Sequence, residues 1–284
     1  MTEIVERHRA LLGRLLPGDD LGGLDVREGQ FHHVVIGTAR VVCLPRTPAA
    51  AARLPARAAV LRALAGFGLG FRTPVPLPPA SDGTRYLVLD RIPGTPLPDG
   101  EPGDPWTAAA MAEQYAAVLA GLARAGADPD VREALPHQEP DRWRRFADDV
   151  RAELYPLMSG QGRRRAEREL TPLAGLPHLT AAVVHGDLGA ANVLWEVPGG
   201  VPRLAGIVDW DEAGLGDPAE DLAAIAASHG TGLLERIIAL TGGPGDALRA
   251  RADVIRGTFA LQQALSAHRD GDAAELADGL ARYL

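Results

Sequence analysis

The second half of the chain changes from a helical to a strand-like period and back again, and this change constrains the fold most. From Trp106 to about residue 176, apolar residues recur at helical spacing. Three short apolar runs follow, AAVVHG, NVLWEV and RLAGIVDW, and the chain then closes in helices. We therefore expect a mainly helical region with a β-hairpin embedded in it.

The first third of the chain has a different pattern, in which strands dominate. An amphipathic helix is expected over residues 3–16, and the runs FHHVVIG and RVVCLP flank a turn at Gly37-Thr38-Ala39. A helix over residues 49–66 and a buried strand from Tyr86 to Leu89 follow. The Pro- and Gly-rich segment IPGTPLPDGEPGDP cannot continue that strand.

These patterns predict an α+β fold with two lobes. Residues 1–91 form a small β-rich N-lobe, residues 92–105 a hinge or linker, and residues 106–284 a larger, mainly helical C-lobe. At about 100 to 200 residues per domain, the chain is long enough for this division.

The loop after the first of the three apolar runs contains the residues that indicate chemistry. Asp187 and Asn192 are five residues apart, which is the Asp-to-Asn spacing of the kinase catalytic loop H-R-D-x-x-x-x-N. Transfer of a phosphoryl group to a hydroxyl needs a carboxylate that accepts the alcohol proton. Asp187 suits that role.

The predicted hairpin supplies the second part of such a site. The runs NVLWEV and RLAGIVD, joined by a turn at Pro198-Gly199-Gly200, bring Asn192 and Asp209 side by side. Amide and carboxylate oxygens are the ligands that Mg²⁺ prefers. The sequence therefore predicts that Asn192 and Asp209 are magnesium ligands.

A helix start follows the hairpin. Asp217 is expected as the N-cap, Pro218 at the first helical position and Glu220 at the third, so Asp217 has a structural role. Only seven residues separate Asp209 from Asp217, which leaves no room for a long phosphorylated activation loop. This spacing argues against a protein kinase.

The composition excludes several functions. All 29 basic residues are Arg, so a lysine Schiff base and a G-x-x-x-x-G-K-[ST] phosphate loop are ruled out. Residues 1–95 contain 12 Arg against 8 Asp and Glu, whereas residues 96–284 contain 17 against 29. The acidic larger part disfavours nucleic acid and anionic membranes as partners and favours a cationic ligand, although an acidic surface also serves solubility. The run Arg163-Arg164-Arg165 is interpreted as a solvated helix face.

The lone cysteine and the N-terminus indicate the compartment. Cys43 rules out an internal disulfide and, flanked by Val and Leu, is expected to be an inert core thiol. The N-terminus is not typical of a signal peptide, and no run approaches the roughly 18 apolar residues that span a bilayer. We expect a cytoplasmic protein.

The segments HGDLGAAN and IVDWDEAGLGDPAEDLA resemble the signature of the aminoglycoside phosphotransferase family. This resemblance covers nearly the whole chain and implies a protein-kinase-like two-lobed fold and a small-molecule kinase. Within the family, EGQFHHVVIG, ALAGFGLGFRTP and IRGTFALQQAL are similar to the group that phosphorylates viomycin and capreomycin. The resemblance implies transfer of the γ-phosphate of ATP, or of GTP, to a hydroxyl of a cationic cyclic peptide antibiotic, as self-resistance.

The family pattern also assigns roles to residues of this chain. It implies that Asp187 is the base, that Asn192 and Asp209 bind Mg²⁺, and that His185 fixes the catalytic loop. The hinge places backbone groups near Asp90, Arg91 and Ile92 against adenine. The nucleotide-covering loop runs through Gly29, Gln30, Phe31, His32 and His33, of which the two histidines are expected to be solvent-facing turn residues.

One departure from the family pattern concerns the phosphate-binding cation. The family usually reads V-L-[RK]-hydrophobic-P-R on the strand after the covering loop, whereas this chain reads VVCLPR, with Cys43 in place of the cation. The Glu partner on the N-lobe helix is replaced by Arg57. We predict that Arg57 from the helix, or Arg46 from the strand end, neutralises the α and β phosphates.

The acceptor site is predicted from charge. Asp211 and Glu212 follow the metal-site strand and are expected to line the acceptor cleft, which Asp270 and Asp272 extend. Other acceptors stay open, namely an aminoglycoside, a macrolide, choline or homoserine. Two other classes also stay open, a non-catalytic kinase-like binding module and a metal hydrolase, although no second His lies at ligand spacing near His185. The oligomeric state is not predicted.

Overall fold

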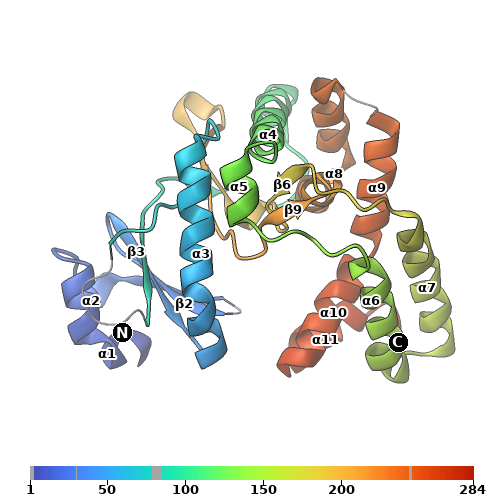
Figure 1. Ribbon diagram of the computed structural model, residues 1–284, viewed down its shortest axis with the longest axis horizontal. Helices are drawn as coiled ribbons and strands as arrows, with labels where there is room; N and C mark the ends of the chain where they lie inside the picture. Colours follow the sequence, from blue (N-terminus) through green and yellow to red (C-terminus); the bar gives the residue numbers. More distant parts are fainter. Residues whose placement is uncertain (1–2, 30, 79–84, 243–244) are drawn as a thin grey trace.

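The computed structural model describes residues 3–29, 31–78, 85–242 and 245–284. It shows a small lobe built on an antiparallel sheet and a larger, mainly helical lobe, which lie to the left and right of Figure 1. The α+β class expected from the sequence is confirmed. Within the described residues, no helix has the length and apolarity needed to cross a membrane.

The N-lobe sheet has four strands in chain order. These are β1 (Asp25–Glu28), β2 (His32–Ile36), β3 (Arg40–Pro45) and β4 (Leu87–Asp90), each antiparallel to the next. Because side chains alternate along a strand, β3 contributes side chains to two hydrophobic cores, one on each face of the sheet. Val42 and Leu44 pack with the N-terminal helices, whereas Cys43 packs in the cluster that includes α3.

Helices cover both faces of this sheet. The segment expected as one helix over residues 3–16 forms two, α1 (Glu3–Arg7) and α2 (Arg9–Leu15). The opposite face is covered by α3 (Pro48–Phe67), whose first turn is capped by the Thr47 side chain. This helix ends at Phe67, slightly beyond the end expected from the sequence, and its C-cap Gly68 has the left-handed conformation that favours glycine.

The C-lobe contains the expected hairpin between its helices. Strands β7 (Val193–Glu196) and β8 (Arg203–Ile207) form it, and β5 (Thr95–Pro96) from the hinge segment adds a third strand. A separate pair, β6 (Ala182–Val184) and β9 (Gly214–Gly216), lies at the start of the predicted catalytic loop. The helices are α4 (Pro105–Ala125), α5 (Pro129–Ala134), α6 (Arg142–Asp149), α7 (Gly160–Leu170), α8 (Ala219–Thr241), α9 (Gly245–Gly257), α10 (Phe259–Asp270) and α11 (Ala273–Leu280).

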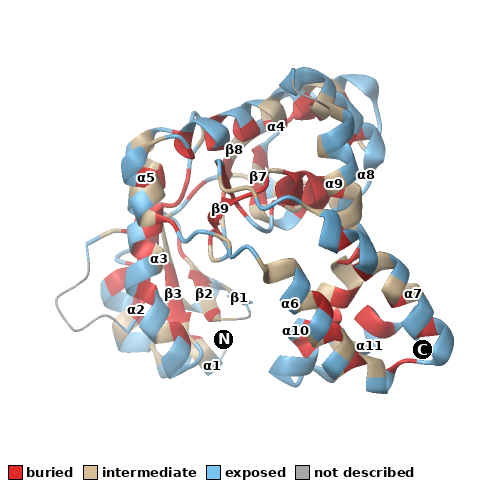
Figure 2. Ribbon diagram, turned by 45° about the vertical axis from the view of Figure 1, so that its right-hand side comes forward, coloured by how far each residue is buried: buried red, intermediate tan, exposed pale blue. Residues whose placement is uncertain are grey.

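Four of these helices form a unit with a hydrophobic cluster of its own. Buried side chains of α6, α7, α10 and α11, among them Leu170, Leu261 and Leu280, pack together with Tyr283 of the C-terminal segment. Figures 1 and 2 show this unit at the lower right, away from the N-lobe sheet. The main core joins α3 to α4, α8 and the hairpin, so it fixes the N-lobe helix relative to the catalytic segment.

The helix start after the hairpin differs in detail from the expectation. Asp217 does cap the helix, since its Oδ1 accepts the Ala219 N–H at 3.0 Å, and it also pairs with Arg251 at 2.6 Å. However, α8 begins at Ala219 rather than at Pro218. The Glu220 side chain does not complete a capping box, because it turns to Arg142, 2.6 Å away.

Candidate active site

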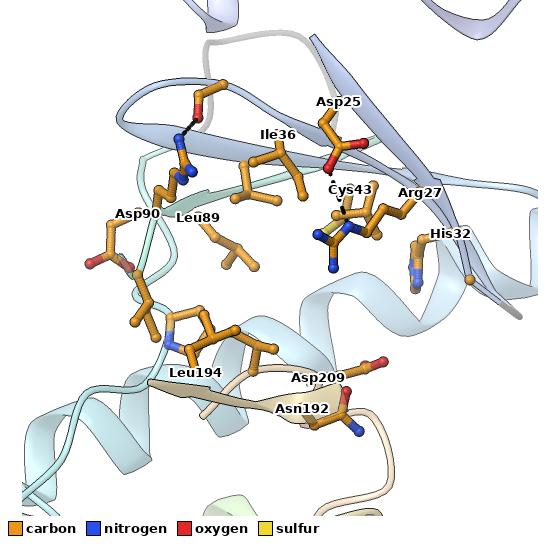
Figure 3. A pocket seen from close by; sticks show the side chains of 18 of the residues that line it. Asp25, Arg27, His32, Ile36, Cys43, Leu89, Asp90, Asn192, Leu194 and Asp209 are labelled. Atoms are coloured by element: carbon orange, nitrogen blue, oxygen red, sulfur yellow. Dashed lines mark hydrogen bonds and ion pairs between the residues drawn. The ribbon is translucent and has the colours of Figure 1, made fainter. Parts of the chain in front are cut away.

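A cavity of about 700 Å³ lies between the N-lobe sheet and the C-lobe hairpin. Figure 3 shows the strands of the N-lobe above it, Leu89 and Asp90 at one end, and Asn192 and Asp209 at the other. The hinge, the covering hairpin and the loop after β8 therefore all face one space. This cavity unites most of the residues that the sequence singled out.

The catalytic loop begins at His185, directly after β6. His185 is fully buried, and its Nδ1 accepts the Asp187 N–H at 3.2 Å while its Nε2 lies 2.9 Å from the Val208 carbonyl. Nε2 therefore donates, and the ring is neutral, in agreement with burial lowering the pKa of His185. The ring thus joins the catalytic loop to the end of the hairpin, which supports its predicted role.

Asp187 and Asn192 are in direct contact. The Asn192 Nδ2 donates to the backbone oxygen of Asp187 at 2.8 Å and to its Oδ2 at 2.9 Å. These bonds fix the amide so that the Asn192 Oδ1 faces away from Asp187. They use only Oδ2 of the Asp187 carboxylate, so its Oδ1 is available to a substrate. The predicted base and the predicted metal ligand are therefore oriented by each other.

Asp209 has an unusual backbone conformation. Its φ of 63° is the single positive value among the non-glycine residues that the structure describes. Such a conformation costs free energy and is retained where the surroundings enforce it. Desolvation raises the pKa of the Asp209 carboxyl, and the nearby carboxylate of Asp211 raises it further. The strained turn places this carboxylate on the wall of the cavity.

The donor set at this end of the cavity fits Mg²⁺. The hairpin brings the two predicted ligands together, since the Val208 N–H donates to the Asn192 carbonyl at 2.9 Å next to Asp209. In the described part of the chain, no three His, Cys, Asp or Glu side chains gather around one point. Mg²⁺ needs few protein ligands, because it keeps waters and binds substrate phosphates. One amide oxygen from Asn192 and one carboxylate from Asp209 meet that requirement.

The nucleotide-covering loop is the tip of the β1–β2 hairpin. Gly29 and Phe31 line the cavity, and Gln30 lies outside the described residues. His32 is 5% exposed and faces the cavity from β2, so its expected solvent-facing position is wrong. Strand alternation explains this difference, because His33 next to it is only partly buried and does not line the cavity.

Two backbone N–H groups of the hinge form hydrogen bonds within the protein, and a third lies at the cavity. The Asp90 N–H donates to Val75 and the Arg91 N–H to Ala39, each at 3.0 Å. For the N–H of Ile92, the described residues provide no acceptor, and Ile92 lines the cavity. The hinge therefore offers Ile92 as a donor at the place where adenine was expected.

The position of the missing cation is occupied by a buried thiol. Cys43 lines the cavity, and burial raises its pKa to about 11, so it is an uncharged core thiol as expected. Arg57 reaches the cavity from α3. Arg46 does not line it and instead contacts Glu28 at 2.9 Å and the Gly29 carbonyl at 2.9 Å.

The four predicted acceptor residues lie in two different places. Asp211 and Glu212 line the cavity, but Asp211 is paired with Arg57 at 2.5 Å. Desolvation raises the pKa of Glu212, with a contribution from Asp211. Asp270 and Asp272 are at the α10–α11 junction and do not line this cavity. Asp272 is the N-cap of α11, where its Oδ1 accepts two N–H groups at 3.1 Å.

The sequence matches the model of the phosphotransferase enzyme family over residues 25–255, a span that contains the β1–β2 hairpin, the hinge, the predicted catalytic loop and the β7–β8 hairpin. The chain belongs to this family. Viomycin phosphotransferase from Streptomyces vinaceus is 62% identical over 284 residues, with 99% of each sequence covered.

Solved structures support the fold of this phosphotransferase. The GDP complex of wild-type aminoglycoside 2′-phosphotransferase-IIIa matches with a TM-score of 0.81 at 18% identity, covering 97% of this chain and 96% of that one. Macrolide 2′-phosphotransferase type I matches with a TM-score of 0.74 at 26% identity, covering 100% and 98%. The two-lobed, protein-kinase-like fold is confirmed.

Two residues that hold the predicted catalytic loop were not predicted from the sequence. Asp221 is fully buried in α8, and its carboxylate accepts the N–H groups of His185 and Gly186. Ser228 accepts the Ala190 N–H with its Oγ at 2.9 Å. The seven-residue interval equals about two turns of helix, so one face of α8 holds both ends of the catalytic loop. The seven-residue interval between Asp221 and Ser228, taken together with the HGDLGAAN motif, is the sequence pattern from which their role could have been predicted.

Proposed function

We propose that this phosphotransferase moves the γ-phosphate of ATP, or of GTP, to a hydroxyl of a cationic cyclic peptide antibiotic of the viomycin and capreomycin class. The identity of 62% to viomycin phosphotransferase over nearly the whole chain is the observation that carries this proposal. The acidic character of residues 96–284 supports a cationic acceptor. Such a reaction confers resistance on the producing cell.

Asp187 acts as the general base. Its Oδ1 receives the proton of the acceptor hydroxyl as the new oxygen–phosphorus bond forms, and the nucleoside diphosphate leaves with the electrons of the broken bond. The Asn192 amide, bonded to Oδ2, holds the carboxylate in position for this step. His185 keeps the loop in register with the hairpin.

Asn192 and Asp209 would hold Mg²⁺. When bound, the ion neutralises charge on the nucleotide phosphates and fixes their orientation. The hinge contributes the Ile92 N–H to the base of the nucleotide, and the apolar lining from Val41 and Leu89 covers its faces. We also propose a cytoplasmic location, because the reaction consumes a nucleoside triphosphate that is made inside cells.

The experiment that tests this function is a panel of acceptors with ATP or GTP and Mg²⁺. Viomycin and capreomycin are compared with kanamycin, a macrolide, choline and homoserine, and products are identified by mass spectrometry. Phosphorylated viomycin or capreomycin is expected, with the phosphate on a seryl hydroxyl. Product from another alcohol alone would change the acceptor class, and nucleotide binding without any product would support a binding module.

A macrolide is the second candidate acceptor. The likeness to macrolide 2′-phosphotransferase type I, at 26% identity over the full length of this chain, supports it. The expected order is that the cyclic peptides give the higher kcat/KM, because identity to the viomycin enzyme is far greater.

A further inference from the structure

Arg57 is a largely buried cation that connects the N-lobe helix α3 with the loop after β8. Its side chain is 12% exposed. Nε lies 2.5 Å from Oδ1 of Asp211, and Nη2 lies 3.8 Å from Oδ1 of Asp209, the predicted magnesium ligand. Nη1 lies 3.2 Å from Nδ1 of His32 on the covering hairpin. One guanidinium thus contacts the covering hairpin and the metal loop together.

The polar groups of this cluster are incompletely satisfied. Nε of Arg57 and Oδ1 of Asp211 are close enough for an ion pair but lack the alignment of a hydrogen bond. Nε2 of His32, also buried, has no partner among the described residues. Because Nδ1 of His32 accepts from Arg57, Nε2 carries the proton and is a donor. A buried donor without an acceptor is costly, and His32, like Arg57, lines the cavity.

An anion suits the unpaired Nε2–H of His32 and the guanidinium of Arg57 beside it. Figure 3 shows the His32 ring projecting from the hairpin toward Asp209 and Asn192, where the phosphates of a nucleotide would meet Mg²⁺. The guanidinium fork of an arginine matches phosphate oxygens. Low exposure strengthens this attraction, because water screens it less.

Other arginines fit this place less well. Among the described residues, Arg27, Arg57 and Arg91 line the cavity. Arg91 donates to the Gly37 carbonyl at 3.0 Å, near the hinge. Arg27 is on β1, 60% exposed and 3.3 Å from Asp25. Only a weak attraction is expected from such an exposed, screened cation.

We propose that Arg57 binds the nucleotide phosphates in place of the absent lysine, and that Asp211 and His32 position it. This inference rests on the proposed function. The cation comes from the helix, and its carboxylate partner comes from the C-lobe loop next to the metal site. Asp211 is therefore a positioning residue for Arg57 and not a direct ligand of the acceptor. The pair also holds the two lobes together at the phosphate end of the cavity.

Nucleotide binding measured without an acceptor tests the role of Arg57. Titration calorimetry with Mg-ADP and with adenosine is compared for wild type, Arg57→Gln and the control Arg62→Gln, which changes an exposed arginine of the same helix. Arg57→Gln should weaken ADP binding by about tenfold or more and leave adenosine binding unchanged, since adenosine lacks phosphates. Arg62→Gln should bind both like wild type.

The results distinguish failure of this inference from failure of the proposed function. Wild type that binds no ADP would overturn both. Unchanged ADP binding in Arg57→Gln, or a phosphate-specific loss in Arg27→Gln or Arg46→Gln alone, would overturn only the assignment of Arg57. If Arg57→Gln does not fold because Asp211 is left unpaired, the double variant Arg57→Gln/Asp211→Asn removes both charges and is used in its place.

A double-mutant cycle tests the role of Asp211. If Asp211 acts through Arg57, Asp211→Asn raises the KM for ATP by about threefold or more in wild type and has no effect in the Arg57→Gln background. Asp211→Glu, which keeps the charge, should restore part of the loss. If Asp211 binds the acceptor instead, Asp211→Asn raises the acceptor KM, and its effect adds to that of Arg57→Gln. Additive effects would contradict the proposal.

Discussion

The carboxylate of Asp221 accepts the backbone N–H groups of His185 at 2.9 Å and of Gly186 at 3.0 Å, although 35 or more positions separate them in the sequence. Gly186 has a φ of 88°, and a Cβ there would lie 2.8 Å from the Glu212 carbonyl. The start of the catalytic loop is thus held by a buried carboxylate on one side and by a close backbone contact on the other. This relationship fixes where Asp187 can point.

Asp221 should make the stability of the protein depend on pH. Burial raises its pKa from 3.8 to about 7. Between these values the folded protein retains a proton that the unfolded chain has released, so the free energy of unfolding falls as the pH rises. Relative to that of Asp221→Asn, the free energy of unfolding of wild type should fall by roughly 1 kcal/mol per pH unit between about pH 5 and 7. Urea unfolding of both proteins measures this difference, and a difference independent of pH would contradict it.

Ser228 should affect turnover more than nucleotide binding. Ser228→Ala removes the acceptor of the Ala190 N–H, which is buried beside the catalytic loop. If the lost hydrogen bond raises the activation free energy by about 1 kcal/mol, kcat should be roughly fivefold lower. The Kd of ADP should not change. Thr241→Ala, at the exposed end of the same helix, is the control. Equal kcat values for the two variants would show that Ser228 does not position the loop.

Gly162 should be intolerant of a side chain. A Cβ at this position would lie 1.7 Å from the Tyr283 carbonyl oxygen, so Gly162→Ala must displace the C-terminal segment from α7. Overpacking of this kind costs about 1–3 kcal/mol, or roughly 5 °C of Tm. Gly160→Ala in the same helix meets only the Arg164 side chain at 3.8 Å and should leave Tm unchanged or slightly higher. Thermal unfolding of the two variants decides, and equal Tm values would refute the predicted clash.

Asp187 should be needed for chemistry but not for binding. Asp187→Asn keeps the shape of the side chain and removes the base, so kcat should fall by about 10²- to 10⁴-fold. The Kd of Mg-ADP should stay within about twofold, because this carboxylate is assigned to the acceptor hydroxyl. Stopped assays with phosphorylated product measured directly test this expectation. Retention of most of the activity would exclude Asp187 as the base.

The sequence predicted those parts of the site that are close together along the chain. Asp187 and Asn192 share one loop, and a single hairpin connects Asn192 to Asp209, so spacing and turn residues were enough. The two lobes followed from the change of period and from the Pro-rich hinge. The short strands β1 and β9 were missed, because four and three residues give little alternation to detect.

Contacts between distant segments were not predictable in the same way. Asp221 is next to a charged residue at a helix start, a position that is usually solvated, yet it is fully buried. His32 was expected in solvent because it was assigned to a turn, but it belongs to β2, whose register turns it inward. Asp211 was assigned to the acceptor from charge alone, whereas its contact with Arg57 depends on how α3 packs over the C-lobe. The burial of Asp221 and the contact of Asp211 with Arg57 both depend on tertiary packing that no local pattern encodes, whereas the position of His32 follows from the alternation of β2.

The relative kcat/KM for capreomycin or viomycin, kanamycin and a macrolide tests the central claim most directly. With saturating Mg-ATP and product detected by mass spectrometry, the kcat/KM of the cyclic peptides should exceed that of the other two acceptors by at least about 100-fold, and Asp187→Asn should form that product at least about 100-fold more slowly. A higher kcat/KM for kanamycin or the macrolide, or equal product formation by Asp187→Asn, would contradict the proposed function.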